Sequence, residues 1–194
     1  MRIIIAVCSG SGYIPVPVVA SLDSLECKYE TRNIFFGRQM IDESRNCAIK
    51  YALEQKATHL MFIDDDQLFE PDIIDKLLAV DADIACAPVI SRVGKQQINI
   101  FDEKLERIPI EEFTETREIY ACGMGLTLIK CSILEKMNFT YPFMFGAGEI
   151  DGKPKKISED LMFCMRVQDL GGKVVAVKGI KTGHIGNPQA YWYE

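Results

Sequence analysis

The chain has 194 residues, of which 48% are hydrophobic and 26% are charged, and its net charge is −6. This composition is typical of a globular protein, and the acidic balance argues against a general nucleic-acid binder, which would usually be basic. The apolar runs are much shorter than the ~20 residues of a membrane helix, and the N-terminus lacks a signal-peptide pattern. We therefore expect a cytoplasmic protein without a membrane span.

Predicted strands and helices alternate along the first half of the chain. Strands are expected at 2–8, 30–36, 59–63 and 83–87, and helices at 15–25, 40–55 and from residue 71 onward. This alternation predicts a parallel, doubly wound sheet. Such sheets bind ligands at the carboxyl ends of their strands.

The second half is less regular. Residues 91–120 are polar and strand-like, which indicates meandering strands or a long functional loop, and residues 138–157 are expected to be a loop. The remaining predicted elements are strands at 121–130 and 173–177 and a helix at 158–170, which Ser158 would cap and Gly171 and Gly172 would end. No linker divides the chain, so we predict one domain over 1–194.

The seven cysteines are scattered along the chain and form no C-x-x-C pair, so they indicate neither a zinc site nor a disulfide framework. We expect them to be reduced, buried small side chains. They are Cys8, Cys27, Cys47, Cys86, Cys122, Cys131 and Cys164.

Three consecutive aspartates, Asp64, Asp65 and Asp66, are the strongest functional signal. They directly follow the apolar strand at 59–63, and side chains alternate along a strand, so Asp64 and Asp66 are expected to point the same way. Adjacent carboxylates repel each other, and Mn²⁺ or Mg²⁺ bound through oxygen would supply the counter-charge. Such an ion could bridge a diphosphate and offset the charge of a leaving nucleotide. The alternative is an acidic turn before the next helix.

Two later segments carry weaker signals. Glu159 and Asp160 open a predicted helix, where a carboxylate could accept the proton of an attacking hydroxyl, although acids at this position also suit the helix dipole. His184 lies between glycines and could bind a divalent metal, or it could be an ordinary turn residue. His59, at the start of a strand, is interpreted as structural.

Three further features each have a structural explanation beside the functional one. Ser9 opens a Ser-Gly-Ser-Gly turn that is neither a P-loop nor a dinucleotide fingerprint, but that could contact a base or ribose. Arg45 could reach a phosphate or anchor the aspartates, or it could be exposed to solvent. The cluster of Lys153, Lys155 and Lys156 could meet a phosphate, but it is interpreted as a solvated loop.

Taken in order, these segments resemble the GT-A glycosyltransferases. The resemblance extends over most of the chain and depends on the order of the motifs, each of which is weak alone. The matching segments are 3–12, Arg45-Asn46, the D-x-D motif at 62–66, 121–125, Glu159-Asp160 and Gly183-His184. Residues 158–186 also look like the corresponding stretch of polypeptide N-acetylgalactosaminyltransferases.

The resemblance implies a GT-A α/β fold, with a mostly parallel central sheet and helices on both faces. It also implies metal-dependent transfer of a sugar from a nucleotide-sugar donor, most often a UDP-sugar, to a hydroxyl acceptor. Residues 1–90 would bind the nucleotide, and residues 91–194 the donor sugar and the acceptor. Asp64, Asp66 and His184 would hold Mn²⁺ or Mg²⁺. Asp160 beside Glu159 would be the catalytic base in an inverting enzyme or would position the substrate in a retaining one, and the sequence leaves both outcomes open. The residues implied in donor binding are Ser9, Arg45, Asp64, Asp65, Gly123, Met124 and Gly125.

The acceptor and the assembly are not indicated. The chain is short for this family, so we expect the acceptor site to be small or to be supplied by a partner subunit or oligomer. A glycan, a protein, a small molecule or a modified nucleic acid would each be compatible as acceptor. Two other functions stay open: a nucleotidyltransferase that makes a nucleotide-sugar, and a non-catalytic domain that binds a nucleotide or sugar. The former class typically has a longer glycine-rich loop with Arg and Lys after the first strand, which residues 9–13 lack.

Overall fold

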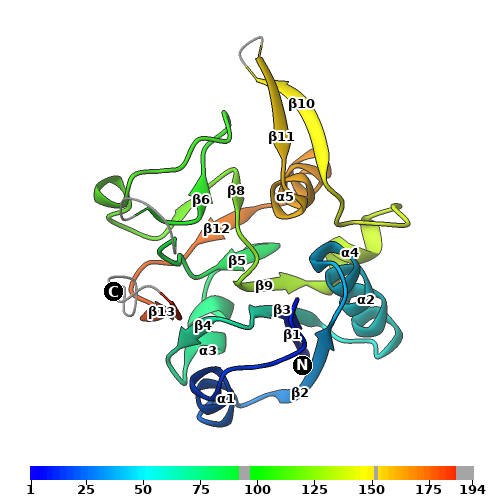
Figure 1. The fold of residues 1–194 in the computed structure, drawn as a ribbon, viewed down its shortest axis with the longest axis vertical. Helices are drawn as coiled ribbons and strands as arrows, with labels where there is room; N and C mark the ends of the chain where they lie inside the picture. The colour runs from blue at the N-terminus through cyan, green and yellow to red at the C-terminus, as the bar shows by residue number, and fades with distance from the viewer. Residues whose placement is uncertain (92–96, 151–152, 187–194) are drawn as a thin grey trace.

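The computed structural model describes residues 1–91, 97–150 and 153–186. Its central element is a seven-stranded sheet with the order β2-β1-β3-β9-β5-β12-β7 (Figure 1). Five strands run in one direction, whereas β9 and β7 are antiparallel to their neighbours. The strands are β1 (Arg2–Ser9), β2 (Glu30–Gly37), β3 (His59–Asp64), β5 (Ile84–Cys86), β7 (Arg117–Glu118), β9 (Leu126–Lys130) and β12 (Val174–Ala176). The predicted mostly parallel α/β sheet is confirmed.

Helices cover both faces of this sheet, because the apolar side chains of each buried strand alternate between two cores. On β1, Ile4 and Ala6 belong to one core, and Ile3 and Ile5 belong to the other. The first core packs against α2 (Ile41–Glu54), α4 (Cys131–Lys136) and α5 (Glu159–Asp169). The second packs against α1 (Val16–Asp23) and α3 (Ile73–Leu78).

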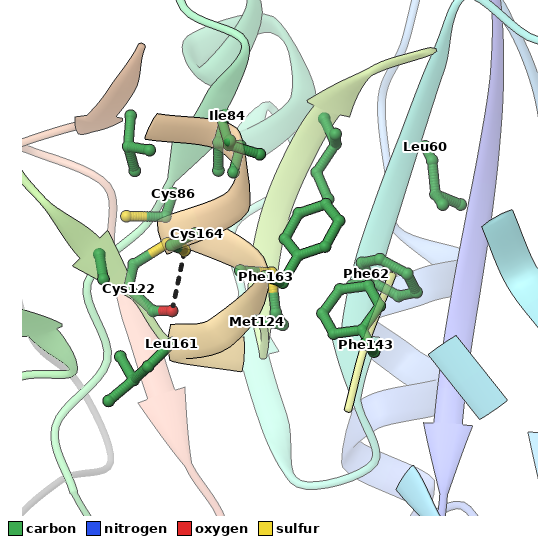
Figure 2. Packing of buried hydrophobic residues seen from close by; sticks show 14 of the residues in the cluster. Leu60, Phe62, Ile84, Cys86, Cys122, Met124, Phe143, Leu161, Phe163 and Cys164 are labelled. Carbon is green, nitrogen blue, oxygen red and sulfur yellow. Dashed lines mark hydrogen bonds between the residues drawn. The ribbon is translucent and has the colours of Figure 1, made fainter. Parts of the chain in front are cut away.

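The start of α5 is held in place by aromatic packing. Phe163 of α5 stacks on Phe143 with ring centroids 4.2 Å apart, and Phe143 meets Phe62 of β3 edge to face at 5.5 Å (Figure 2). The Cys164 thiol also donates a hydrogen bond to the Cys122 carbonyl, with a sulfur–oxygen distance of 3.7 Å (Figure 2). The helix that carries Asp160 is therefore fixed against the central sheet.

The strand predicted at 121–130 is interrupted at its glycines. β8 (Ala121–Cys122) pairs with β6 (Ile100–Phe101), whereas β9 pairs with β3 and β5. Residues 123–125 connect β8 to β9. This break leaves a short stretch of backbone at the end of the sheet where β3 terminates.

Several segments differ from the sequence prediction. The loop expected at 138–157 contains the antiparallel hairpin of β10 (Gly146–Ile150) and β11 (Lys153–Ile157), which projects from the body of the protein (Figure 1). The basic cluster therefore lies in a strand. The short β4 (Gln67–Phe69) and β13 (Thr182–His184) were not predicted, because their pairing joins distant parts of the chain. A 3-10 helix at Ile110–Glu112 lies in the irregular region.

The cysteine prediction is confirmed in its chemistry, since all seven thiols are free. It is wrong for two positions, because Cys47 is exposed and Cys27 is half-buried. Within the described ranges, no helix has both the length and the apolar character required to cross a bilayer.

Candidate functional site

A cavity of about 360 Å³ lies at the carboxyl ends of β1 and β3. This volume is in the range of small-molecule binding sites. The cavity brings together eight of the residues predicted from the sequence: Asp64, Asp65, Asp66, Gly123, Met124, Gly125, Asp160 and His184. These residues come from both halves of the chain, so the fold collects the separate motifs into one place.

Asp64 and Asp66 have different partners, although both line the cavity. Asp64 is the last residue of β3, whereas Asp65 and Asp66 form the turn that leads into β4. The alternation of a strand therefore ends at Asp64 and does not orient Asp66. Asp64 faces Arg45, and Asp66 faces His184.

The ladder between β4 and β13 positions His184. His184 lies opposite Gln67 in this ladder, and Nε2 of its imidazole is 3.2 Å from Oδ2 of Asp66. Nδ1 lies 2.7 Å from the carbonyl oxygen of Ile90, which can only accept, so Nδ1 carries a proton. The Gln67 amide donates to Oδ1 of Asp66 at 2.9 Å. Both side chains are thus oriented by neighbours.

The predicted metal ligands do not all converge. Among the residues that the structure describes, no group of three or more His, Cys, Asp or Glu side chains is arranged to hold a metal ion. Asp66 and His184 offer a carboxylate oxygen and an imidazole nitrogen side by side, which suits a divalent cation whose other ligands are phosphate and water oxygens. Asp64 instead accepts hydrogen bonds from Arg45 at 3.1 and 3.5 Å.

Arg45 is buried and links two of the predicted motifs. Its guanidinium donates to Glu159 Oε1 at 2.5 Å and to Asp64 Oδ1 at 3.1 Å, and its side chain is 3% exposed. Burial lowers the pKa of Arg45, but Asp64, Asp160 and Glu159 outweigh burial and raise it above its ordinary value. The structure therefore matches the interpretation that Arg45 anchors an aspartate and excludes the solvent-exposed alternative.

Glu159 and Asp160 are adjacent but have different surroundings. Glu159 is buried against Arg45 and does not line the cavity, and burial raises the pKa of its carboxyl despite the nearby guanidinium. Asp160 lines the cavity, and its Oδ1 accepts hydrogen bonds from the Ser158 hydroxyl and the Leu161 amide. Ser158 is the N-cap residue of α5, as predicted, but its hydroxyl orients Asp160 and caps no helix amide. Of the two predicted catalytic acids, only Asp160 faces the cavity.

Ser9 does not reach the cavity. Its buried hydroxyl donates to the Tyr13 carbonyl at 2.9 Å and accepts from the Gly12 amide at 3.0 Å, so it stabilises the turn after β1. Gly10 lines the cavity in its place. The interpretation of 9–12 as a turn therefore fits Ser9 better than donor contact.

Sequence reasoning missed a second group of lining residues. Five of them follow β5. Three of these, Ser91, Asn99 and Arg107, lie in the segment 91–120 that had been predicted only as meandering strands or a functional loop; residues 92–96 of that segment lie outside the described residues. The missed lining residues are Ile41, Gln67, Val89, Ile90, Ser91, Asn99 and Arg107, whereas Cys8 and Gly10 belong to the segment 3–12 that the resemblance had matched. No periodic pattern marked them, and only the polar character of the segment could have drawn attention to it.

Solved structures with a similar fold are known, although no similar sequence was found. No protein-family model and no curated protein sequence matches the chain. The crystal structure of A197 from STIV is similar over 99% of this chain and 93% of that chain, with a TM-score of 0.70 and 18% identity. S. aureus TarS 1-349 in complex with UDP is similar over all of this chain and 60% of that chain, with a TM-score of 0.56 and 14% identity.

A second structure of TarS 1-349, in complex with UDP-GlcNAc, gives a TM-score of 0.53 at 14% identity over all of this chain and 58% of that chain. The chain thus spans most of A197 but less than two thirds of TarS 1-349. Likeness at these identities shows the fold alone. The chain has a GT-A-like fold, as the sequence resemblance predicted.

Proposed function

We propose that the chain is a metal-dependent glycosyltransferase that moves a sugar from a UDP-sugar to a hydroxyl acceptor. The observation that carries this proposal is the shared cavity, in which the Asp66–His184 pair and the Asp160 carboxylate line one space with Gly123 and Gly125. The complexes of TarS with UDP and with UDP-GlcNAc support it, because they show these ligands on a similar fold.

The residues of the cavity would have separate parts in this reaction. Asp66 and His184 would hold Mn²⁺ or Mg²⁺, which when bound would offset the negative charge of the leaving diphosphate. Asp160 would accept the proton of the acceptor hydroxyl, since within the described structure its Oδ2 accepts no hydrogen bond. Arg45 would keep Asp64 and the first turn of α5 in register from outside the cavity.

Calorimetry with UDP in the presence and absence of Mn²⁺ tests donor binding. We expect UDP to bind only with the metal, and Asp66→Ala to abolish the heat. Asp81→Ala is the matched control, because Asp81 is an exposed acid that pairs with Lys130 away from the cavity. Binding of UDP without metal, or equal binding by Asp66→Ala, would contradict the proposal.

The reaction itself is tested by screening UDP-sugars for Mn²⁺-dependent hydrolysis, since many transferases slowly pass sugar to water. Asp160→Asn is expected to keep UDP affinity and to lose about 10²–10⁴-fold in rate, the usual contribution of a general base. Binding without turnover of any donor, with Asp160→Asn unchanged, would indicate a non-catalytic domain. Release of pyrophosphate from a nucleoside triphosphate would indicate a nucleotidyltransferase.

A further inference from the structure

The cavity contains one strong cation that has no acidic partner in the described part of the protein. Arg107 is the only arginine or lysine among the described residues that line the cavity, beside four aspartates. Its guanidinium donates one hydrogen bond, to the Ile98 carbonyl at 3.2 Å, and lies 5.2 Å from the centre of the Phe101 ring. Within the described ranges it forms no ion pair. Most of its five N–H donors are therefore available to a ligand.

Asn99 places a second donor group beside it. Oδ1 of Asn99 accepts a hydrogen bond from the Val89 amide at 2.7 Å, which fixes the orientation of the side-chain amide. Nδ2 then lies against Gly123, where a Cβ added to the glycine would approach it to 2.9 Å. In the described structure Nδ2 has no acceptor. Arg107 lies near Asn99, because its guanidinium donates to the carbonyl of Ile98, the residue before Asn99.

Residues 123–125, which include Gly123 and Gly125, lie between the Asn99 amide and the aspartates. A Cβ on Gly125 would lie 3.1 Å from Asp64 Oδ2, and a Cβ on Gly123 would lie 2.9 Å from Asn99 Nδ2. Two residues of backbone span at most about 7 Å. A sugar ring that extends from a diphosphate held at the aspartates would therefore cover the glycines and reach the Asn99 amide and Arg107.

We infer that the transferred sugar carries a carboxylate, as a uronic acid does, and that Arg107 with Asn99 recognises it; this inference rests on the proposed function. A planar guanidinium matches a carboxylate through two parallel hydrogen bonds. A neutral hexose would need no such cation, and the four aspartates of the cavity would repel an acidic sugar that had no cationic partner.

Paired donors that differ only at C6 test this inference. Calorimetry with Mn²⁺ compares UDP-glucuronic acid with UDP-glucose, and UDP-galacturonic acid with UDP-galactose. We expect the wild type to favour one uronate by about 10-fold to 100-fold, the usual effect of a hydrogen-bonded charge. Arg107→Gln should lose this preference and leave the affinity for UDP unchanged. Lys104→Gln, which removes a nearby charge outside the cavity, should keep it.

Each other result has a distinct meaning. Equal binding of both members in both pairs would overturn the inference and leave the proposed function intact. If Arg107→Gln, shown to be folded by circular dichroism, bound UDP itself more weakly, Arg107 would be assigned to the diphosphate. This result would also overturn the inference. A third result would be that free glucuronate binds the Mn²⁺–UDP complex through Arg107 while the donors show no preference. This result would place the carboxylate on the acceptor and would overturn its assignment to the donor sugar. Failure of the wild type to bind UDP would overturn the proposed function and this inference with it.

Discussion

Nε2 of His184 lies 3.2 Å from Oδ2 of Asp66, and the ladder between β13 and β4 brings these two residues together. The backbone amide of Ile185 also donates to the carbonyl of Asp66 at 2.8 Å, which extends the contact beyond the ladder. Because the imidazole is oriented by Ile90 and the carboxylate by Gln67, the pair is held by the protein itself. If the pair holds the proposed metal, these contacts would orient its ligands.

Substitution of Arg45 is expected to destabilise the fold. Arg45→Met would leave the buried Glu159 and the partly buried Asp64 without their cation, and loss of one partner from a buried ion pair costs about 3–5 kcal/mol. Urea denaturation measures the change. Arg2→Met is the control, because it removes only exposed contacts, namely the pair with Glu30 and a hydrogen bond to the Gln55 carbonyl, and it should change stability by about 1 kcal/mol or less.

The effect of Arg45→Met should also depend on pH. Burial raises the pKa of Asp64 and of Glu159 above their ordinary values of 3.8 and 4.5, against the opposing effect of Arg45. A carboxyl whose pKa is raised in the folded state binds more protons in the folded than in the unfolded protein. Its contribution to stability therefore falls as the pH rises from the ordinary pKa to the raised one. Without Arg45 this fall should be steeper. Denaturation at several pH values should therefore show the smallest defect near the ordinary carboxyl pKa values and a larger one at neutral pH, and a defect that does not change with pH would contradict this account.

Gly125 is expected to be required for the shape of the cavity. Gly125→Ala would place a methyl group 3.1 Å from Asp64 Oδ2 and 3.3 Å from Gln67 Cγ, and Gln67 orients Asp66. Small displacements at a reacting centre can cost up to about 10²-fold in rate, so donor hydrolysis should fall by about 10-fold to 100-fold. Gly10→Ala is the control, because Gly10 lines the cavity but a Cβ there would meet nothing within 4 Å.

Local sequence patterns predicted the parts of the fold that depend on local chemistry. The apolar run before Asp64 and the alternation of strands and helices were sufficient to place the aspartates at the carboxyl edge of the sheet. The pairing of β4 with β13 depends on contacts between distant segments, so the sequence could not show that His184 faces Asp66 and not Asp64. Arg45 illustrates a second limit, since an arginine on a polar helix usually faces solvent, and only the tertiary structure shows that it is buried.

The thiols should divide into reactive and protected groups. Cys47 is exposed and Cys27 is half-buried, whereas the other five cysteines are buried. Burial raises the pKa of Cys8 to about 12, so its reactive thiolate is scarce at neutral pH even though the residue borders the cavity. We expect a thiol reagent at pH 8 to modify Cys47 rapidly, Cys27 slowly and the rest only after denaturation. Mass spectrometry that found rapid modification of Cys8 in the native protein would contradict the described packing.

Asn46 should contribute to stability through its contacts with the backbone of Phe143. Its Nδ2 donates to the Phe143 carbonyl at 2.8 Å, and its Oδ1 accepts from the Phe143 amide at 2.9 Å. Because Phe143 is fully buried between Phe62 and Phe163, Asn46→Ala would leave both backbone groups without a partner, at about 1–3 kcal/mol for each group. Asn46→Asp can still accept from the amide but cannot donate to the carbonyl, so it should be destabilised as well.

Denaturation with urea distinguishes this role from a general effect of losing an asparagine. Asn33→Ala on the exposed strand β2 removes the same side chain without a described hydrogen bond and should change stability by less than about 0.5 kcal/mol. If Asn46→Ala were no less stable than Asn33→Ala, the contact between α2 and Phe143 would not support the aromatic stack. The position of α5, and with it that of Asp160, would then have to depend on the Arg45–Glu159 pair and on the packing of Cys164.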